Sequence, residues 1–581
     1  MDRQHVADAL EEIGLLLELL GENPFKTRAY HNGARIIRSL DRDLEEVVRR
    51  KELTQIKGIG AALADKISTL VEGSRLPYLE QLRAQVPSGL LEWLKIPGLG
   101  AKKARAIHVA LGISTVGELE YACAENRLRD LDGFGEKSQK KILAGIERLR
   151  RHAGRFRQPV VRGESQRLLD LVRGLPGVHR AEVGGSVRRC SETSKDIDIV
   201  VSADGAETVM EAFAGAPDVE EVTGLGPTKC SVRLVSGPSA DLRVVDEDSF
   251  PFALMYFTGS KAHNIGLRGR AQKLGYKLNE YALVEEESGE KIGCRDEAAI
   301  YERLGLSYIE PELREDTGEI EASEGGGLPC LIEYDDLQGV LHCHSNWSDG
   351  TATIEEMAEA ARGMGLTYLG LCDHSQSAAY AGGLDARRVR EQHVEIDGLN
   401  RRYAERFRVL KGIEVDILAD GTLDFPDEVL RSFDLVVASV HSRFNLGENQ
   451  QTERILRALD NPYVDTLGHA TGRLLLARDG YELDLTRVLN VAAERGISVE
   501  VNAHPSRLDL DWRSLRYGLN KGMKTSINPD AHATDGLRDM KYGIGVARKG
   551  WCTKDDVLNA WPLERLLEHL RHRRRDAGAE S

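Results

Sequence analysis

Two aspartates stand two residues apart at the start of an apolar segment, residues 196 to 201, Asp-Ile-Asp-Ile-Val-Val. Polar and apolar residues alternate there, which predicts a β-strand whose two carboxylates leave one face while the isoleucines enter the core. Carboxylates this close repel one another unless cations lie between them, and paired divalent ions about 4 Å apart suit in-line displacement at phosphorus. The pattern therefore predicts a two-metal site for nucleotidyl transfer.

The residues around this strand strengthen the prediction. Upstream, Gly-Gly-Ser at 184–186 offers backbone N–H groups and a hydroxyl, while Arg188 and Arg189 add positive charge for a polyphosphate. Downstream, Ala-Asp-Leu-Arg-Val-Val at 240–245 predicts a second alternating strand that brings a third acid, Asp241, beside the first two. A lone Asp-x-Asp pair is more often part of a solvated edge strand. The glycine segment, the two arginines and the third acid nearby favour the metal site.

A second set of potential ligands begins after residue 340. Histidines and acids stand at the ends of successive apolar segments, and helical patterns separate these segments, which predicts a βα barrel with its active site at the carboxyl ends of the strands. One such histidine is more often a buried core residue, but the repetition indicates a centre of two or three zinc, manganese or iron ions that activates water against a phosphodiester. Cys343, between two ligands, is expected to point away. The candidate ligands are His342, His344, Asp349, His374, Glu414, His441, His469, Asp530 and His532.

Three Gly-x-Gly turns, each followed by a helical pattern, lie within the first 140 residues. Such turns leave helix N-terminal amides free to hold a DNA phosphate without reading sequence. One of them alone would be a tight helix–helix turn, but three, two of them followed by lysines, indicate helix-hairpin-helix DNA binding. The candidate contacts are Gly58, Gly60, Gly98, Gly100, Lys102, Gly133, Gly135 and Lys137.

Length and composition predict a multidomain protein. A chain of 581 residues exceeds one hydrophobic core and suggests three to five units. We expect a cytosolic protein with reduced thiols, because the chain has no long apolar run and its eight cysteines are scattered. The net charge is −15, whereas the first 155 residues carry 26 Lys and Arg against 22 Asp and Glu. DNA contact should therefore depend on local basic groups and backbone amides.

These segments together resemble bacterial family X DNA polymerases that end in a polymerase and histidinol phosphatase (PHP) domain. The Gly-Ser loop, the Asp-x-Asp strand and the Asp-Leu-Arg-Val-Val strand look like the family's palm. Tyr-Phe-Thr-Gly-Ser at 256–260 matches the segment that the family uses against the incoming nucleotide, and the histidine-rich region retains all nine PHP ligand positions. The resemblance covers residues 1 to 570.

The resemblance implies roles for individual residues. Asp196, Asp198 and Asp241 would hold two Mg²⁺ or Mn²⁺ ions, and Asp241 would help to orient the primer 3′-OH. The nine PHP ligands would serve a 3′–5′ exonuclease that could also cut abasic sites or remove blocked 3′ ends. Residues implied in nucleotide binding are Gly185, Ser186, Arg189, Tyr256, Phe257, Gly259, Asn264 and Arg268.

A 5′-deoxyribose phosphate lyase activity occurs in some family members and depends on a lysine amine. The resemblance aligns Lys66 with that lysine. Ala62 stands where those enzymes have a helper lysine, and Phe25 replaces the histidine of the phosphate pocket. We therefore favour a surface lysine on a DNA-facing helix.

The resemblance also implies the architecture. Helix-hairpin-helix domains would precede an α+β nucleotidyltransferase palm and thumb, and a distorted (β/α)7-type PHP barrel would follow. The predicted parts are an N-terminal DNA-end-binding domain at 1–82, fingers at 83–156, palm at 157–246, thumb at 247–320, an acidic Gly-rich linker at 321–334 that begins near residue 316, and the PHP domain at 335–575. The charged run from residue 571 onward is expected to be a solvated end.

The predicted function is a DNA repair polymerase of the base excision type that fills short gaps. It would act on gapped or nicked DNA with dNTPs, away from membranes, as a monomer in the cytoplasm at the nucleoid. One alternative is an untemplated nucleotidyltransferase, which the helix-hairpin-helix turns and the 256–260 segment oppose. Another is a DNA-end-binding PHP nuclease with an inactive palm, which the three retained palm carboxylates oppose.

Overall fold

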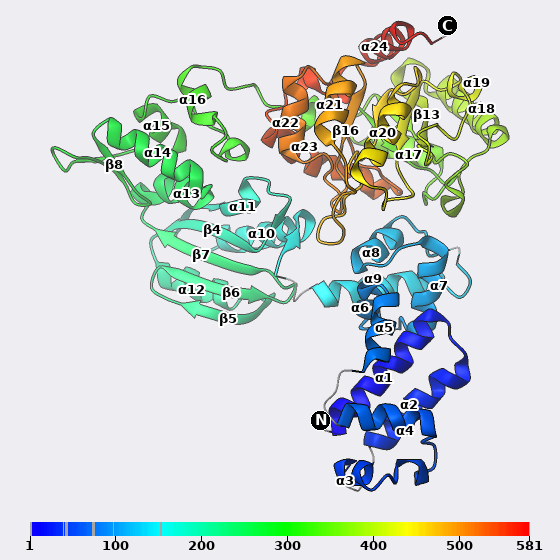
Figure 1. The fold of residues 1–581 in the computed structure, drawn as a ribbon. Helices are drawn as coiled ribbons and strands as arrows, with labels where there is room; N and C mark the ends of the chain where they lie inside the picture. The colour runs from blue at the N-terminus through cyan, green and yellow to red at the C-terminus, as the bar shows by residue number, and fades with distance from the viewer. Residues whose placement is uncertain are drawn as a thin grey trace. The chain divides into compact units, whose positions relative to one another are not determined.

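The computed structural model describes residues 3–38, 40, 44–71, 76–96, 98–129, 131–150 and 154–579. The chain divides into two compact units, Met1–Leu149 and Arg150–Ser581. Figure 1 shows helices alone in the first unit and sheets flanked by helices in the second. The break lies close to residue 156, where the sequence predicts that the palm follows; the finer division into six parts remains a prediction.

The N-terminal unit is helical because its apolar residues recur at helical spacing. They meet in one continuous core in which Leu10, Ile37, Ile67, Trp93 and Ile107 are fully buried. The helices are α1 (Arg3–Leu20), α2 (Pro24–Arg38), α3 (Leu44–Arg49), α4 (Ala61–Val71), α5 (Pro77–Gln85), α6 (Ser88–Trp93), α7 (Ala101–Leu111), α8 (Val116–Ala124) and α9 (Glu136–Arg150).

The second unit begins with a five-stranded sheet in the order β2-β4-β7-β6-β5. Strands β4 and β7 are parallel, and the other neighbours are antiparallel. The predicted alternation is confirmed, because Ile197 and Ile199 are buried in the core beneath α10 and α12. The elements are β1 (Phe156–Arg157), α10 (Gln158–Arg173), β2 (Val178–Val183), α11 (Gly185–Arg188), β3 (Thr193–Ser194), β4 (Asp196–Ala203), α12 (Ala206–Ala214), β5 (Val219–Leu225), β6 (Lys229–Leu234) and β7 (Ser239–Val245).

A small α+β subdomain follows and extends into the segment that the sequence predicts as a linker. The last helix of the subdomain, α16, reaches the start of that segment, and Glu319 at its first position is fully buried, 2.6 Å from His263 Nδ1. A buried acid needs such a partner, which ties the helix down. The elements are α13 (Phe250–Thr258), α14 (Lys261–Lys273), β8 (Tyr276–Leu278), β9 (Leu283–Glu285), β10 (Lys291–Ile292), α15 (Glu297–Arg303) and α16 (Glu319–Glu324).

The C-terminal part confirms the predicted βα barrel. Seven parallel strands follow one another in the order β11 to β17, and the barrel nearly closes where Cys343 pairs with Ala531 and Leu341 N–H donates to Asn528 Oδ1 at 2.9 Å. The strands are β11 (Gly339–Cys343), β12 (Tyr368–Leu371), β13 (Arg408–Asp416), β14 (Leu435–Ser439), β15 (Thr466–Leu467), β16 (Ser498–Asn502) and β17 (Thr525–Asn528). The helices are α17 (Ile354–Gly363), α18 (Ala386–Tyr403), α19 (Asp427–Leu430), α20 (Glu448–Leu459), α21 (Leu485–Glu494), α22 (Trp512–Asn520), α23 (Met540–Lys549) and α24 (Leu563–Asp576).

The charged C-terminal run is not a solvated end at every position. Arg573 and Arg574, on α24, both pair with Asp465, whose side chain is fully buried. A buried carboxylate requires such cations, so these arginines dock α24 on the barrel. None of the described helices is both long and apolar enough to cross a membrane.

Candidate functional site

The three palm aspartates converge on two parallel strands, as predicted. Asp196 and Asp198 leave one face of β4, and Asp241 on β7 lies opposite Asp198 in the register. Burial, followed by the charges of Asp196 and Asp241, raises the pKa of Asp198 to about 6. A carboxylate crowded by two others in this way favours a bound cation, so these residues fit divalent ions.

Two residues that support Asp241 were missed at the sequence level. Lys229 Nζ lies 2.7 Å from Asp241 Oδ2, and Ser231 Oγ donates to Oδ1 at 2.6 Å. Both lie on β6, where Ser231 pairs with Asp241 in the antiparallel register. The alternation of polar residues in Lys-Cys-Ser was a signal, but only the strand order placed it beside the acids.

The glycine loop lies directly against Asp198. Gly184 N–H donates to Asp198 O at 2.8 Å, and Gly185 adopts a φ of +61°. A Cβ atom on Gly185 would lie only 2.2 Å from Asp198 Oδ2. Glycine is required here both by the left-handed backbone and by this close approach.

We therefore expect Gly185→Ala to impair nucleotide incorporation. The added methyl group would displace the Asp198 carboxylate, and displacement of a reacting group by about 1 Å can cost about 100-fold in rate. Single-turnover primer extension would measure the loss. Gly205→Ala is the matched palm control, since nothing lies within 4 Å of its added Cβ. Equal rates for the two variants would contradict this role of Gly185.

The two loop arginines have different surroundings. Arg188 forms a two-bonded ion pair with Glu297, at 3.0 and 2.6 Å, and donates to Thr258 Oγ1. Arg189 Nε lies 3.0 Å from Glu315 Oε1, and its Nη1 donates to Thr258 O. Both arginines therefore connect the palm loop to the subdomain that follows it.

The 256–260 segment lies beside the palm loop. A Cβ atom on Gly184 would lie 3.5 Å from Phe257 O, and Gly259 turns the chain with a φ of +68° between α13 and α14. Asn264 is nearly buried and donates through Nδ2 to Tyr256 O at 2.8 Å, while Arg268 Nε donates to Asn264 O at 3.3 Å. Asn264 thus fixes the backbone of this segment through its hydrogen bond to Tyr256 O.

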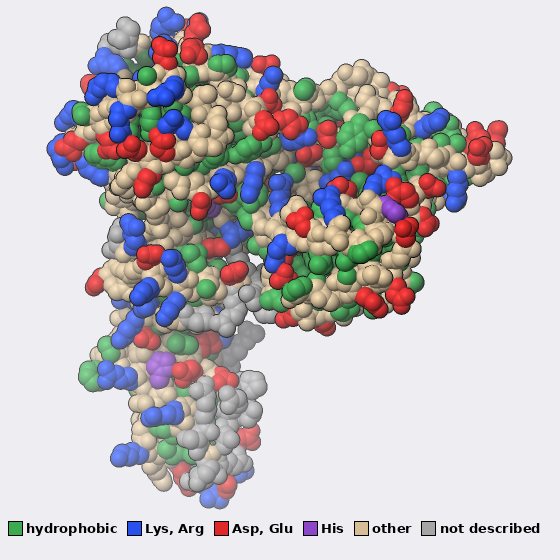
Figure 2. All heavy atoms as spheres, turned by 180° about the vertical axis from the view of Figure 1, so that it is seen from behind, with side chains coloured by type: hydrophobic (Ala, Val, Ile, Leu, Met, Phe, Trp, Pro, Cys, Tyr) green, Lys and Arg blue, Asp and Glu red, His purple; other side chains and the backbone are tan. Residues whose placement is uncertain are grey.

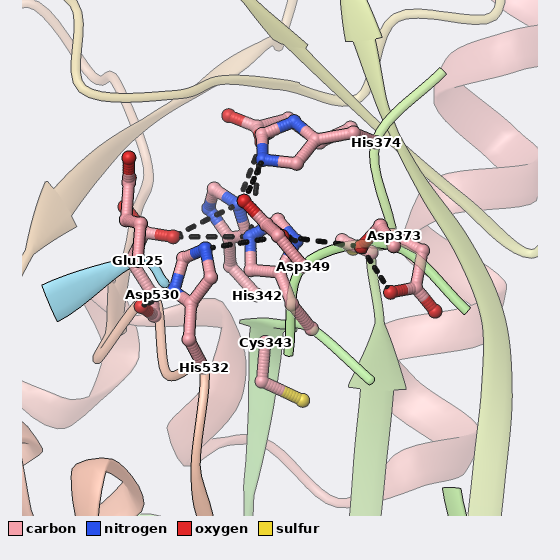
Figure 3. Close-up of polar contacts among 12 residues, drawn as sticks. Glu125, His342, Cys343, Asp349, Asp373, His374, Asp530 and His532 are labelled. Carbon is pink, nitrogen blue, oxygen red and sulfur yellow. Dashed lines mark hydrogen bonds and ion pairs between the residues drawn. The ribbon is translucent and has the colours of Figure 1, made fainter. Parts of the chain in front are cut away.

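The nine predicted PHP ligands come together at the carboxyl ends of the barrel strands. Three sets of atoms lie close enough to bind an ion: His344, Asp349, His374 and His532; His342, His344 and Asp530; and His374, Glu414 and His441. The ninth residue, His469, places Nε2 2.9 Å from Glu414 Oε1. Figure 3 shows the rings and carboxylates turned toward one another, whereas the Cys343 thiol points away as predicted.

This cluster fits a group of metal ions. Buried atoms without a hydrogen-bond partner in the described chain include His342 Nε2, His344 Nδ1 and Asp349 Oδ2, which is unusual unless a cation binds them. Burial lowers the pKa of His342, but Glu500 and Glu414 outweigh burial and hold that pKa well above its usual value. A pocket with this much buried negative charge favours cations.

Two acids lie behind the candidate ligands, in contact with their imidazole rings, and were missed at the sequence level. His342 Nδ1 lies 2.8 Å from Glu500 Oε1, and His441 Nδ1 lies 2.9 Å from Asp416 Oδ1. Glu500 also accepts from His469 N–H at 3.0 Å. Asp416 follows Glu414 by two residues on the same strand face, a signal that the period of two could have supplied.

We expect Glu500→Gln to weaken metal binding at the PHP site about 10- to 100-fold, because an acid behind a ligating histidine fixes its tautomer and raises its basicity. Titration of metal-depleted protein with Mn²⁺, followed by 3′ degradation, would measure the change. Glu494→Gln, on the exposed surface of α21, is the matched control. Unchanged Mn²⁺ dependence would contradict this role of Glu500.

The three Gly-x-Gly turns share one backbone geometry. Gly58, Gly98 and Gly133 have φ values of +100°, +85° and +79°, and α4, α7 and α9 begin just after the second glycine of each turn. A Cβ atom on Gly60, Gly100 or Gly135 would meet nothing within 4 Å, which leaves these N-termini open to a phosphate. Figure 2 shows Lys and Arg side chains spread over the visible face of this unit, without one dominant patch on that face.

Lys66 is half-buried on α4. Its Nζ donates to Ala62 O at 3.2 Å and lies 5.1 Å from the centre of the Tyr78 ring. Phe25 is 78% exposed. The lyase candidate and its plainer alternative therefore both remain predictions.

Comparison with known proteins agrees with this arrangement. Family models match as a helix-hairpin-helix domain (residues 1–76), a SAM-like helix-hairpin-helix tandem (90–148), a DNA polymerase beta thumb (253–315) and a PHP domain (341–504). A Bacillus subtilis (strain 168) protein named "DNA polymerase/3'-5' exonuclease PolX" is 38% identical over 566 residues, which are 97% of this chain and 98% of that protein. A protein of Thermoanaerobacter sp. (strain X514) named "Probable phosphatase" is 28% identical over 260 residues, 42% of this chain and 98% of its own.

The fold and the two sites thus define a nucleotidyltransferase joined to a PHP domain. The extent of the Bacillus similarity settles which family this is. The chain belongs to the family X DNA polymerases with a C-terminal PHP domain.

Proposed function

We propose that this chain is a DNA-directed DNA polymerase that fills short gaps during repair, and that its PHP domain is a 3′–5′ exonuclease. The observation that carries the polymerase is the pairing of Asp198 with Asp241 on parallel strands beside the Gly185 loop. The relative whose name joins both activities matches nearly end to end, which supports the pairing of the two functions.

In the polymerase site, Asp196, Asp198 and Asp241 would hold two Mg²⁺ or Mn²⁺ ions, which supply charge neutralisation for phosphoryl transfer. Ser186 and Arg189 would bind the triphosphate, and Asp241 would orient the primer 3′-OH. The 256–260 segment, with Asn264 behind it and Arg268 beside it, would receive the sugar and base. The open helix N-termini of the Gly-x-Gly turns would hold backbone phosphates of the gapped DNA.

In the PHP site, nine ligands would hold two or three Zn²⁺, Mn²⁺ or Fe ions, which supply an activated water. The substrate would be the 3′ end of DNA, including abasic or blocked termini. We further propose that the chain acts as a monomer in the cytoplasm, at the nucleoid.

Primer extension on a duplex with a one-nucleotide gap, with each template base in turn, would test the polymerase. We expect insertion of the complementary dNMP with Mg²⁺ or Mn²⁺. Insertion that ignores the template base would favour an untemplated nucleotidyltransferase. Tight gap binding without insertion would favour a DNA-end-binding nuclease.

A further inference from the structure

One helix of the PHP domain, α23, contacts the end of the glycine loop of the palm, residues 184–190. A Cβ atom on Gly545 would lie 2.9 Å from Cys190 Cβ, so only glycine allows this approach. Lys549 lies four residues further along α23, on the same side of the helix, and its Nζ donates to Arg189 O at 3.2 Å. The helix therefore contacts Arg189 and Cys190, the last two residues of this loop.

Lys549 also binds the carboxylate that holds Arg189. Its Nζ pairs with Glu315 Oε1, and Arg189 Nε lies 3.0 Å from the same oxygen. The Lys549 residue is only 4% exposed, and its ammonium lies 5.4 Å from the centre of the Trp512 ring. A lysine buried this deeply on two protein oxygens is part of a built contact and not a solvated charge.

The charges of this contact suit a triphosphate site. Two cations, Lys549 and Arg189, share one carboxylate, so positive charge remains for an anionic ligand. Without Lys549, Glu315 alone would neutralise Arg189 and would be free to move. The preceding residue, Arg314, accepts a hydrogen bond from Ser260 N–H through its backbone carbonyl oxygen at 3.0 Å. The same short segment therefore also supports the turn at Gly259 and Ser260.

We propose that Lys549 of the PHP domain is a positioning residue for the polymerase: it fixes Glu315, which holds Arg189 for the incoming triphosphate. This inference rests on the proposed role of Arg189 in dNTP binding. It makes the PHP domain part of the polymerase site in addition to its own chemistry. The two activities would then share a structural element without sharing a metal centre.

Steady-state gap filling by the full-length protein would test the inference in Lys549→Met, with Lys541→Met, on an exposed position of the same helix, as the matched control. We expect Lys549→Met to raise the KM for dNTP about tenfold with a smaller change in kcat, as for a contact between coupled charges. Lys541→Met should leave the KM unchanged. Exonuclease activity, which does not use Lys549, should persist and report a folded PHP domain.

A double-mutant cycle with Arg189→Ala distinguishes the inference about Lys549 from the proposed role of Arg189 in dNTP binding, on which it rests. If Lys549 acts through Arg189, Lys549→Met should add little to the KM of Arg189→Ala. The inference would be overturned if Lys549→Met raised the KM of Arg189→Ala by as large a factor as it raises that of the wild type. A normal KM in Lys549→Met alone would also overturn it. A normal KM in Arg189→Ala would instead overturn the proposed role of Arg189.

A variant that removes both members of the Lys549–Glu315 ion pair guards against a folding defect. If Lys549→Met loses exonuclease activity and unfolds at a lower temperature, Glu315→Gln/Lys549→Met takes its place, because the buried ion pair is then removed as a whole and Arg189 keeps its hydrogen bond to Thr258 O. We expect this double variant also to raise the KM for dNTP about tenfold, and to add little to the KM of Arg189→Ala. A normal KM in this double variant would also overturn the inference.

Discussion

Asp198→Ala is expected to abolish DNA synthesis and to leave 3′ degradation intact. Asp198 lies opposite Asp241 in the register and two residues from Asp196 on the same strand, so its removal should take a carboxylate from the residues that would hold the metal ions. We expect a loss of at least about a thousandfold in the rate of incorporation, or about 4 kcal/mol of transition-state stabilisation. Single-turnover extension of a gapped primer measures this directly.

The control for this prediction is Asp204→Ala, which lies just after the end of the same strand and has an exposed side chain. It should extend primers at the wild-type rate. The exonuclease of Asp198→Ala, assayed without dNTPs, should stay within about twofold of wild type, because Asp198 belongs to none of the three sets of potential metal ligands found among the described residues of the PHP domain. Loss of both activities together would show that the two sites are not separate.

The parts of the protein that could be predicted are those with a local pattern. The alternation around Asp198 predicted β4 and its carboxylates, and the repeated histidines after apolar segments predicted the barrel and its nine candidate ligands. Such patterns are local because side-chain direction follows the period of each element.

The residues that escaped prediction are those whose role depends on contacts across the fold. Glu500 reaches His342 over 158 positions, and Lys549 reaches Glu315 over 234. Nothing within a few residues of either one marks it as functional, since an acid in a strand and a lysine at a helix end are ordinary. Arg573 and Arg574 looked like a solvated charge run for the same reason, because their partner Asp465 lies more than 100 positions away.

His344→Ala should have the opposite effect to Asp198→Ala. His344 belongs to two of the three sets of potential ligands, and its Nε2 lies 3.1 Å from Asp530 Oδ1. Its loss should therefore weaken two ion positions at once, and we expect 3′ degradation to fall by at least about a thousandfold. Metal content of the purified protein should fall with it, which gives a measurement that does not depend on activity.

Gap filling by His344→Ala should continue, because the palm aspartates lie on a separate sheet with its own core. His572→Ala, on the exposed part of α24, is the matched control and should keep both activities. Extension in both variants, with degradation lost only in His344→Ala, is the result that two independent centres require. If wild type degrades DNA but neither it nor His344→Ala extends a primer, the palm is a binding site alone, and the chain acts as a nuclease that recognises DNA ends.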